Sequence, residues 1–250
     1  MHNKDVNLSN SLPKTVIIGA TGFLGSAFLT SYREIFHDCI GTTREEDINS
    51  NIFYLDLLEP NIVPLNLVEK GYKEALILAG MTKIDECERN NDLSRRANVL
   101  GTLELSRQLV TRGIKPIFFS SSYVFDGKEG NYSSDVVVNP IMEYGFQKAQ
   151  VESEISRISK GNYLVVRISK VFSLKKGDNT LLDEMASILA TGGVLRAAFD
   201  QIFSPVLISD VIYAVEYLQS NKITGIVNVC SPEIWSRYDL ALALAKTMGV

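Results

Sequence analysis

The chain has 250 residues, a net charge of −4 and 46% hydrophobic residues, enough for one α/β domain or for one domain with a small appendage. This composition excludes the disordered and fibrous classes, and because Lys and Arg are scattered, no nucleic-acid-binding surface is predicted. No apolar run approaches the ~18 residues of a membrane span, and the polar N-terminus lacks the apolar core of a signal peptide. We therefore expect a cytoplasmic protein with no membrane partner.

The chain contains three cysteines, Cys39, Cys87 and Cys230, and two histidines, His2 and His37. The cysteines are odd in number, widely spaced and form no C-x-x-C pair, so neither a disulfide framework nor a zinc site is predicted. One histidine is near the N-terminus and the other follows the first predicted helix. No histidine catalysis and no metal site are therefore expected.

The first predicted strand, 15–19, runs into three glycines spaced three apart and then into a predicted helix, 23–36. Gly19 permits the tight turn, Gly22 lets the backbone approach a phosphate without a Cβ, and Gly25 lets the helix pack closely on the strand. This context favours a dinucleotide site over an ordinary tight turn, with the pyrophosphate at the helix N-terminus. The predicted loop comprises Gly19, Thr21, Gly22, Phe23, Leu24 and Gly25.

The second predicted strand, 38–43, ends in hydroxyl groups and a guanidinium, those of Thr42, Thr43 and Arg44. NAD-preferring folds place an acid here to accept a hydrogen bond from the ribose 2′-hydroxyl, whereas hydroxyls and Arg suit a 2′-phosphate. NADP is therefore the predicted cofactor. NAD is the alternative if Glu45 or Glu46 takes the position of the acid.

Further strand-like runs follow, most of them separated by stretches long enough for a helix. This alternation predicts an α/β fold with a Rossmann-like, doubly wound, mostly parallel sheet and right-handed crossovers. The further runs cover 51–55, 74–79, 115–120 and 162–168.

The alternation loosens after about residue 170. We predict an NAD(P)-binding domain over 1–170 and a smaller substrate-binding lobe over 171–250, which caps the carboxyl edge of the sheet where such folds bind ligands. The predicted elements of the lobe are helices over 179–191, 209–220 and 236–248 and strands over 194–198 and 225–229.

The strand over 115–120 leads into Ser120, Ser121 and Ser122, which face the ligand crevice or satisfy turn amides. Downstream, Tyr144 and Lys148 are four residues apart in a predicted helix and so share one helix face. A Tyr-x-x-x-Lys pair alone is usually a surface pair. Combined with the glycine loop and the serines, it indicates carbonyl chemistry with a nicotinamide.

Reduction of a carbonyl by hydride requires a proton at the developing oxyanion, and a phenol with a pKa near ~10 is a poor acid–base group at neutral pH. A lysine ammonium nearby is expected to lower the pKa of Tyr144 and to hold ribose hydroxyls. Ser121 would bind the substrate oxygen in line with Tyr144 and the hydride.

These motifs resemble the extended short-chain dehydrogenase/reductases of the NAD-dependent epimerase/dehydratase superfamily, and within them the dTDP-4-dehydrorhamnose reductase-like group. G-A-T-G-F-L-G is similar to the glycine loop of the family, S-S-S-Y-V-F-D-G to S-T-D-Y-V-F-D-G, and N-P-I-M-E-Y-G-F-Q-K to P-x-x-x-Y-G-x-x-K. D-Q-I-F-S-P, 200–205, resembles D-Q-x-G-x-P of the sugar-binding lobe. The resemblance implies Tyr144 as acid, Lys148 as its partner and Ser121 as the triad hydroxyl, with Ser120 and Ser122 as alternatives.

The resemblance also implies further cofactor contacts. Asp56 is similar to the acid that meets the adenine amino group, and Asn98 to an asparagine on the helix behind the catalytic tyrosine. Turn residues and a satisfied core amide are the respective alternatives. The turn after the fourth strand, Leu78, Ala79 and Gly80, resembles the segment that runs along the cofactor.

On the substrate side, Arg167 resembles a position beside the active-site crevice, with a structural ion pair as the alternative. Lys170 stands where many relatives have an aromatic residue that stacks on the sugar, and an ammonium prefers phosphate or carboxylate. Ser122 is a further candidate substrate contact. The sequence stops at Val250, whereas relatives continue the lobe, so a small substrate, a completing subunit and a fragment all stay open.

The sequence as a whole predicts an NAD(P)H-dependent reductase of a keto group on a nucleotide-linked or modified sugar, a small-molecule substrate. An epimerase or dehydratase shares the same triad. A non-catalytic nucleotide-binding regulatory subunit is the alternative from another class, and a homodimer stays open.

Overall fold

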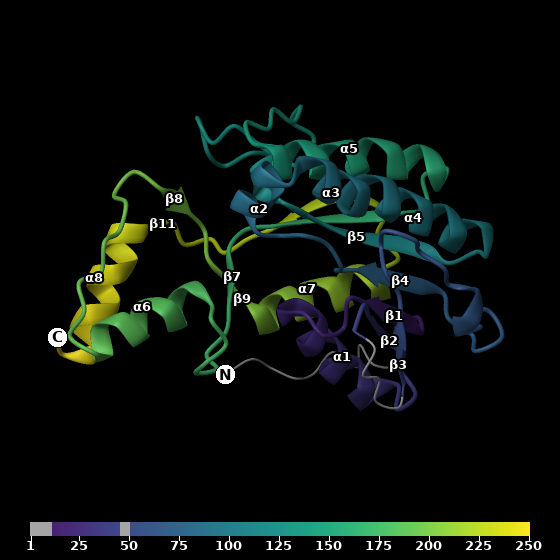
Figure 1. Ribbon diagram of the computed structural model, residues 1–250, viewed down its shortest axis with the longest axis horizontal. Coiled ribbons are helices and arrows are strands. Elements are labelled where there is room, and N and C mark those ends of the chain that lie inside the picture. The colour runs from purple at the N-terminus through teal and green to yellow at the C-terminus, as the bar shows by residue number, and fades with distance from the viewer. Residues whose placement is uncertain (1–11, 46–50) are drawn as a thin grey trace. The chain divides into compact units, whose positions relative to one another are not determined.

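The computed structural model describes residues 12–45 and 51–250 (Figure 1). His2 and Glu46 lie outside these residues. The chain forms two compact units, one made of the described residues up to Arg167 together with Ala214–Asn228, the other of Ile168–Tyr213 and Val229–Val250. The chain is therefore not divided at a single position such as residue 170, because the later segment Ala214–Asn228 belongs to the first unit.

The first unit is built on a seven-stranded sheet in the order β10-β6-β5-β4-β1-β2-β3. Strand β1 pairs in parallel with β2 and β4, β2 with β3, and β4 with β5. This confirms the predicted Rossmann-like fold. The direction of chain progression reverses between β1 and β4, which is where such sheets bind ligands. The strands are β1 (Thr15–Ile18), β2 (Gly41–Thr43), β3 (Ile52–Tyr54), β4 (Glu74–Ile77), β5 (Lys115–Ser121), β6 (Leu164–Ile168) and β10 (Gly225–Val229).

Helices cover both faces of this sheet (Figure 1). One face carries α2 (Ile84–Arg89), α3 (Asn91–Arg95), a π-helical turn η3 (Arg96–Gly101), α4 (Thr102–Thr111) and α5 (Glu143–Ile158). The other carries α1 (Phe23–Ile35) and the C-terminal part of α7 (Ile208–Ser220). The described part of this unit also contains the 3-10 turns η2 (Val63–Leu65) and η4 (Ser122–Val124). No helix in the described ranges is long and apolar enough to cross a membrane.

The strands are apolar along most of their length because both faces of the sheet are covered. Polar residues are buried at the amino ends of three neighbouring strands, where Thr15, Glu74 and Lys115 stand in register. Lys115 Nζ lies 3.3 Å from Glu74 Oε1. Gln219 of α7 donates to Thr15 Oγ1 at 2.9 Å and to Glu74 Oε2 at 2.6 Å. These bonds satisfy the buried polar groups and fasten α7 to the sheet.

The predicted strand over 225–229 is β10 of the central sheet and not part of the smaller lobe. Its apolar side chains and backbone find a partner in β6, and Gly225 N donates to Tyr163 O at 3.0 Å. The predicted strand over 194–198 is absent. Leu195 and Ala197 pack instead against a small apolar cluster, and a short apolar run forms a strand only where a backbone partner is available.

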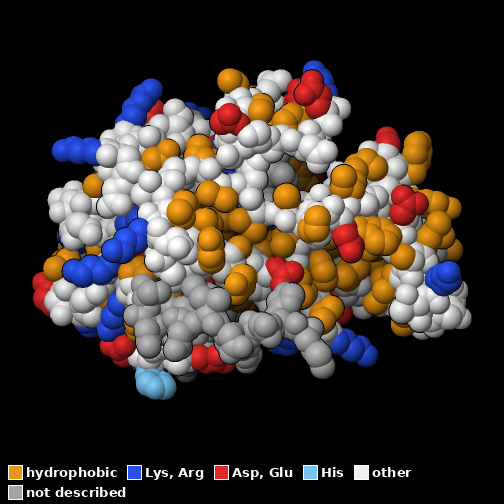
Figure 2. All heavy atoms as spheres, turned by 180° about the vertical axis from the view of Figure 1, so that it is seen from behind, with side chains coloured by type: hydrophobic (Ala, Val, Ile, Leu, Met, Phe, Trp, Pro, Cys, Tyr) orange, Lys and Arg blue, Asp and Glu red, His pale blue; other side chains and the backbone are white. Residues whose placement is uncertain are grey.

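The second unit contains α6 (Leu181–Ala190), α8 (Arg237–Met248) and two short strand pairs. Strand β7 (Val171–Phe172) pairs in parallel with β9 (Val206–Leu207), and β8 (Ile202–Phe203) pairs antiparallel with β11 (Trp235–Ser236). The buried residues of its apolar cluster are Leu181, Met185 and Ala241. Exposed apolar side chains are common in this unit (Figure 2), among them Leu174, Val194 and Phe199.

Candidate functional site

The glycine loop joins β1 to α1 and has the geometry that the three glycines predict. Gly19 has a φ of +90°, and a Cβ there would lie 2.7 Å from Ala79 N. A Cβ on Gly25 would lie 2.0 Å from Gly19 O, so only glycine allows the helix to pack this closely. At Gly22, by contrast, a Cβ would meet nothing nearer than Gly19 O at 3.5 Å. The backbone of Gly22 therefore faces open space at the helix N-terminus.

This difference predicts opposite results for two alanine substitutions. Gly25→Ala should destabilise the fold by about 1–3 kcal/mol or more, because the new methyl group overlaps the backbone. Gly22→Ala should leave thermal stability nearly unchanged and weaken dinucleotide binding, because the methyl group occupies the space for a phosphate. Thermal unfolding and cofactor titration of both variants check this. Normal cofactor affinity in Gly22→Ala would contradict the assignment of the loop.

The start of α1 is open to an anion. Gly22, its N-cap, provides no side-chain cap, and no acidic residue lies in the first turn. Thr21, Gly22 and Phe23 are exposed. The unpaired amides and the helix dipole favour negative charge at this position, so the loop can hold a pyrophosphate.

The end of β2 supports the glycine loop. Thr42 Oγ1 accepts a hydrogen bond from Gly19 N at 3.2 Å, and the Thr43 and Thr21 hydroxyls are 3.0 Å apart. Thr43 Oγ1 also accepts from Glu45 N at 3.2 Å. These buried threonines therefore shape the loop, while Arg44, which is exposed, presents its guanidinium to solvent.

The turn after β4 lies against the glycine loop, since Ala79 is the neighbour that a Cβ on Gly19 would meet. Gly80 follows with a φ of +157°, and a Cβ there would lie 3.0 Å from Asn98 Oδ1. The Asn98 amide is buried, and it hydrogen-bonds to the backbone of this turn. Its Oδ1 accepts from Met81 N at 2.7 Å and its Nδ2 donates to Met81 O at 2.9 Å. Asn98 thus has the satisfied-amide geometry and holds the turn in place.

Asp56 is tied to its own turn, where its Oδ1 accepts from Leu58 N at 2.9 Å. This is the geometry of the turn-residue alternative. Contact of Asp56 with adenine stays a prediction.

Ser121, the last residue of β5, is buried, and its Oγ accepts from Tyr123 N at 3.3 Å. Ser122 is exposed. Ser120 Oγ is buried with no hydrogen-bond partner among the described residues. The strand end therefore presents hydroxyls in three different environments.

Tyr144 lies in the first turn of α5 and is buried. Its ring packs edge-on against Tyr123, with ring centroids 6.3 Å apart. Burial raises the pKa of Tyr144 above its usual value, with smaller contributions from Cys87 and Tyr123. The phenol is therefore protonated at neutral pH, the form that a general acid needs.

Lys148 is buried one turn later on α5. Its Nζ donates to Phe119 O at 2.8 Å and lies 4.5 Å from the Phe118 ring centroid and 5.5 Å from that of Tyr144. Burial lowers the pKa of Lys148 to about 8, against the opposing effect of Glu152. The expectation that Lys148 lowers the pKa of Tyr144 is not met here, because burial of the phenol dominates.

Sequence reasoning missed Gly145, which brings α5 against the turn after β5. A Cβ at this position would lie 2.2 Å from Tyr123 O. Ser121 and Tyr144 are brought together through Tyr123, which binds one and packs on the other. The signal was a glycine inside the first turn of a helix, where it costs stability unless a close approach requires it.

Arg167 forms the structural ion pair that is the alternative to a substrate contact. The buried guanidinium binds Glu152 through Nε at 3.0 and 3.1 Å and through Nη2 at 2.7 Å. Its Nη1 donates to Ser134 O at 3.1 Å. Lys170 is an exposed residue of the second unit. Substrate contacts of Arg167, Ser122 and Lys170 stay predictions.

Comparison with known proteins gives a consistent set of similarities. Residues 13–250 match the family described as RmlD substrate binding domain. A probable low-salt glycan biosynthesis reductase, Agl14 of Haloferax volcanii, is 26% identical over 93% of this chain and 79% of its own length. The methionine adenosyltransferase 2 subunit beta of Xenopus tropicalis is 26% identical over 95% of this chain and 72% of its own.

Solved structures agree in fold. A hypothetical dTDP-4-dehydrorhamnose reductase from Sulfolobus tokodaii has a TM-score of 0.81 and 26% identity, covering 94% of this chain and 82% of that one. The dTDP-4-dehydrorhamnose reductase of Bacillus anthracis, solved in complex with NADP, has a TM-score of 0.77 and 22% identity, and the match covers 96% of this chain and 82% of that one.

Proposed function

Because the chain belongs to the RmlD substrate binding domain family, we propose that it is an NAD(P)H-dependent oxidoreductase that reduces a keto group on a nucleotide-linked or modified sugar. The observation that carries the proposal is the buried Tyr144 and Lys148 pair of α5, next to a β5 end that carries Ser121. The reductase names of the Haloferax volcanii and Sulfolobus tokodaii proteins support the same chemistry.

The residues of the glycine loop and of the β4 turn would hold the cofactor, because Gly22 leaves the space for a phosphate that a Cβ would fill. When bound, a reduced nicotinamide supplies the hydride for the carbonyl carbon. Ser121 donates a hydrogen bond to the carbonyl oxygen, and Tyr144 delivers its phenolic proton there as negative charge develops. Lys148 binds ribose hydroxyls and stabilises the phenolate that remains.

A direct assay tests this function. Purified protein is mixed with NADPH and with a panel of nucleotide-linked 4-keto sugars, and NADPH oxidation and the reduced sugar are measured together. Stoichiometric formation of both supports a reductase. A second reaction with NAD(P)+ and nucleotide-linked sugars that carry a 4-hydroxyl tests the alternatives, because an epimerase or a dehydratase begins by oxidising that hydroxyl. Interconversion of these sugars with no net change in the cofactor would identify the epimerase alternative, and elimination of water the dehydratase.

NADP is the proposed cofactor, with NAD as the alternative. The exposed Arg44 at the end of β2 suits a 2′-phosphate, and the Bacillus anthracis structure is a complex with NADP. We expect NADPH to bind more tightly than NADH and Arg44→Ala to remove most of that difference. Fluorescence titration of both cofactors measures it. Equal or tighter NADH binding that is unchanged in Arg44→Ala would contradict the preference.

A regulatory subunit is the second candidate, favoured by the similarity to a methionine adenosyltransferase 2 subunit beta. Affinity purification of the protein from its own cells, with and without NADPH, tests for a larger enzyme as partner. A stable complex whose partner changes activity on binding, together with no turnover of keto sugars, would favour this candidate.

The finer parts of the proposal concern location and ligands. The site of action is the cytoplasm, which is compatible with the free thiols of Cys39, Cys87 and Cys230. Ser122 and Lys170 bind the substrate, Lys170 through an anionic group. Gel filtration tests the homodimer.

A further inference from the structure

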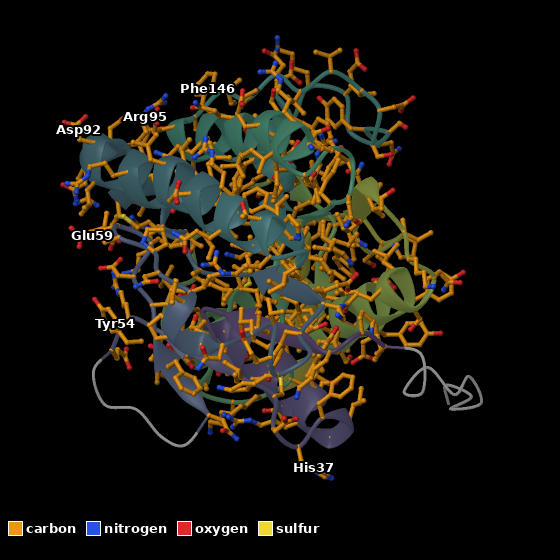
Figure 3. All side chains as sticks on the ribbon, turned by 90° about the vertical axis from the view of Figure 1, so that its right-hand side faces the viewer. His37, Tyr54, Glu59, Asp92, Arg95 and Phe146 are labelled. Atoms are coloured by element: carbon orange, nitrogen blue, oxygen red, sulfur yellow. The ribbon has the colours of Figure 1, made fainter. Side chains whose placement is uncertain are left out.

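Gln147 stands between Tyr144 and Lys148 in sequence and points into the protein. Phe146, its neighbour, is 53% exposed and extends away from α5 (Figure 3), whereas Gln147 is only 1% exposed. A fully buried amide requires partners for both of its polar atoms. Its partners indicate what this residue does.

The Gln147 amide joins two elements that the sequence keeps far apart. Its Oε1 accepts from Asn98 Nδ2 at 2.7 Å, and its Nε2 donates to Ser94 Oγ at 2.8 Å and to Glu143 Oε1 at 3.0 Å. Asn98 in turn binds both backbone groups of Met81, directly after Gly80. A continuous series of hydrogen bonds therefore runs from the β4 turn to the first turn of α5.

The orientation of this series is fixed by donor and acceptor types. Asn98 Oδ1 is committed to Met81 N, so its Nδ2 must face Gln147, which must then present an oxygen. The two hydrogens of Gln147 Nε2 are used by Ser94 and Glu143. A reversed amide would place two donors face to face. A buried network with every member satisfied specifies a single geometry.

We propose that Gln147 is a positioning residue that sets the catalytic helix α5, with Tyr144 and Lys148, against the β4 turn that carries the cofactor. This inference rests on the proposed function, because it assumes a cofactor along the β4 turn. The β4 turn and the glycine loop are in contact at Ala79 and Gly19. The network therefore aligns the group that gives the proton with the loops that would hold the hydride donor.

The test compares Gln147→Met with Gln108→Met. Methionine keeps the length of the side chain and removes its hydrogen bonds. Gln108 of α4 is a matched control, because its amide also bridges to a distant loop: Nε2 donates to Pro60 O at 2.7 Å and Oε1 accepts from Ile62 N at 3.2 Å. For each variant we would measure the melting temperature, the NADPH dissociation constant, and kcat and KM for the keto sugar.

Gln147→Met is expected to lower kcat by roughly 10²-fold, the effect of displacing a reacting group by about 1 Å, and to weaken NADPH binding. Gln108→Met should lower the melting temperature and leave kcat unchanged. Ser94→Ala removes only one hydrogen-bond partner of Gln147 and should lower kcat less. It provides a folded variant for the same measurements if Gln147→Met is unstable.

Equal kcat and NADPH affinity in Gln147→Met and wild type would overturn the inference, as would equal losses of kcat in both methionine variants. If the wild type binds NADPH and reduces no keto sugar, the reductase function fails. The inference is then decided by NADPH affinity, which should weaken in Gln147→Met and not in Gln108→Met. If the wild type binds no NADPH, both are overturned.

Discussion

Tyr144→Phe is expected to lower turnover of a keto sugar by roughly 10²–10⁴-fold, the usual loss when a general acid is removed. The substitution removes one hydroxyl and keeps the ring, which is buried and packed edge-on against Tyr123. Folding and NADPH affinity should therefore persist. Steady-state kinetics, a cofactor titration and a melting curve on the same preparation measure the three quantities.

Two further variants separate the roles around Tyr144. Ser121→Ala should lower kcat with little change in NADPH affinity, because its proposed contact is to the reacting oxygen. Lys148→Met should weaken cofactor binding and also lower the rate, because it removes both the ribose contact and the charge.

A different outcome would favour the regulatory candidate. The wild-type protein would bind NADPH without reducing a keto sugar, and its role in the cell would persist in Tyr144→Phe. The triad would then not be used for catalysis.

The sequence predicts the local geometry of the candidate site well where neighbouring residues decide the structure. The glycine loop, the end of β5 and the Tyr144–Lys148 spacing each depend on neighbouring residues, and the resemblance drawn from them is confirmed by the family match over 13–250. The open side of Gly22 and the close packing of Gly25 follow from the absence of a Cβ. These features can be predicted from the sequence because they depend on residues that are close together along the chain.

Long-range pairings were not predictable in the same way. The apolar run of β10 gives no sign that it joins the sheet beside β6, and the short, mostly apolar run 194–198 gives no sign that it lacks a strand partner. The sign of the pKa shift of Tyr144 also depended on its burial, which no residue spacing reveals. Gln147 could have been noticed as a polar residue between the two candidate catalytic residues of α5, although most of its partners lie in other elements.

Arg167→Met is expected to destabilise the protein by about 3–5 kcal/mol, because it leaves the Glu152 carboxylate buried with no opposite charge. Both side chains are buried, and three contacts of 2.7 to 3.1 Å join them. The guanidinium also lies 5.1 Å from the centroid of the Phe125 ring and binds Ser134 O, so the loop after β5 loses two contacts as well. Urea denaturation of the variant measures the loss.

The double variant Arg167→Met with Glu152→Leu distinguishes an ion pair from a substrate contact. Replacing both charges by apolar groups of similar volume is often neutral, so most of the lost stability should return. If Arg167 also binds substrate, KM should stay raised in the double variant even though stability returns, whereas a purely structural arginine leaves the KM of the double variant close to that of the wild type. Glu152 lies one turn beyond Lys148 on α5 and opposes the lowering of the pKa of Lys148. Once Arg167 is removed, the Glu152 carboxylate should raise the pKa of Lys148. An upward shift in the pH profile of NADPH binding by Arg167→Met would show that the ion pair also sets the charge of Lys148.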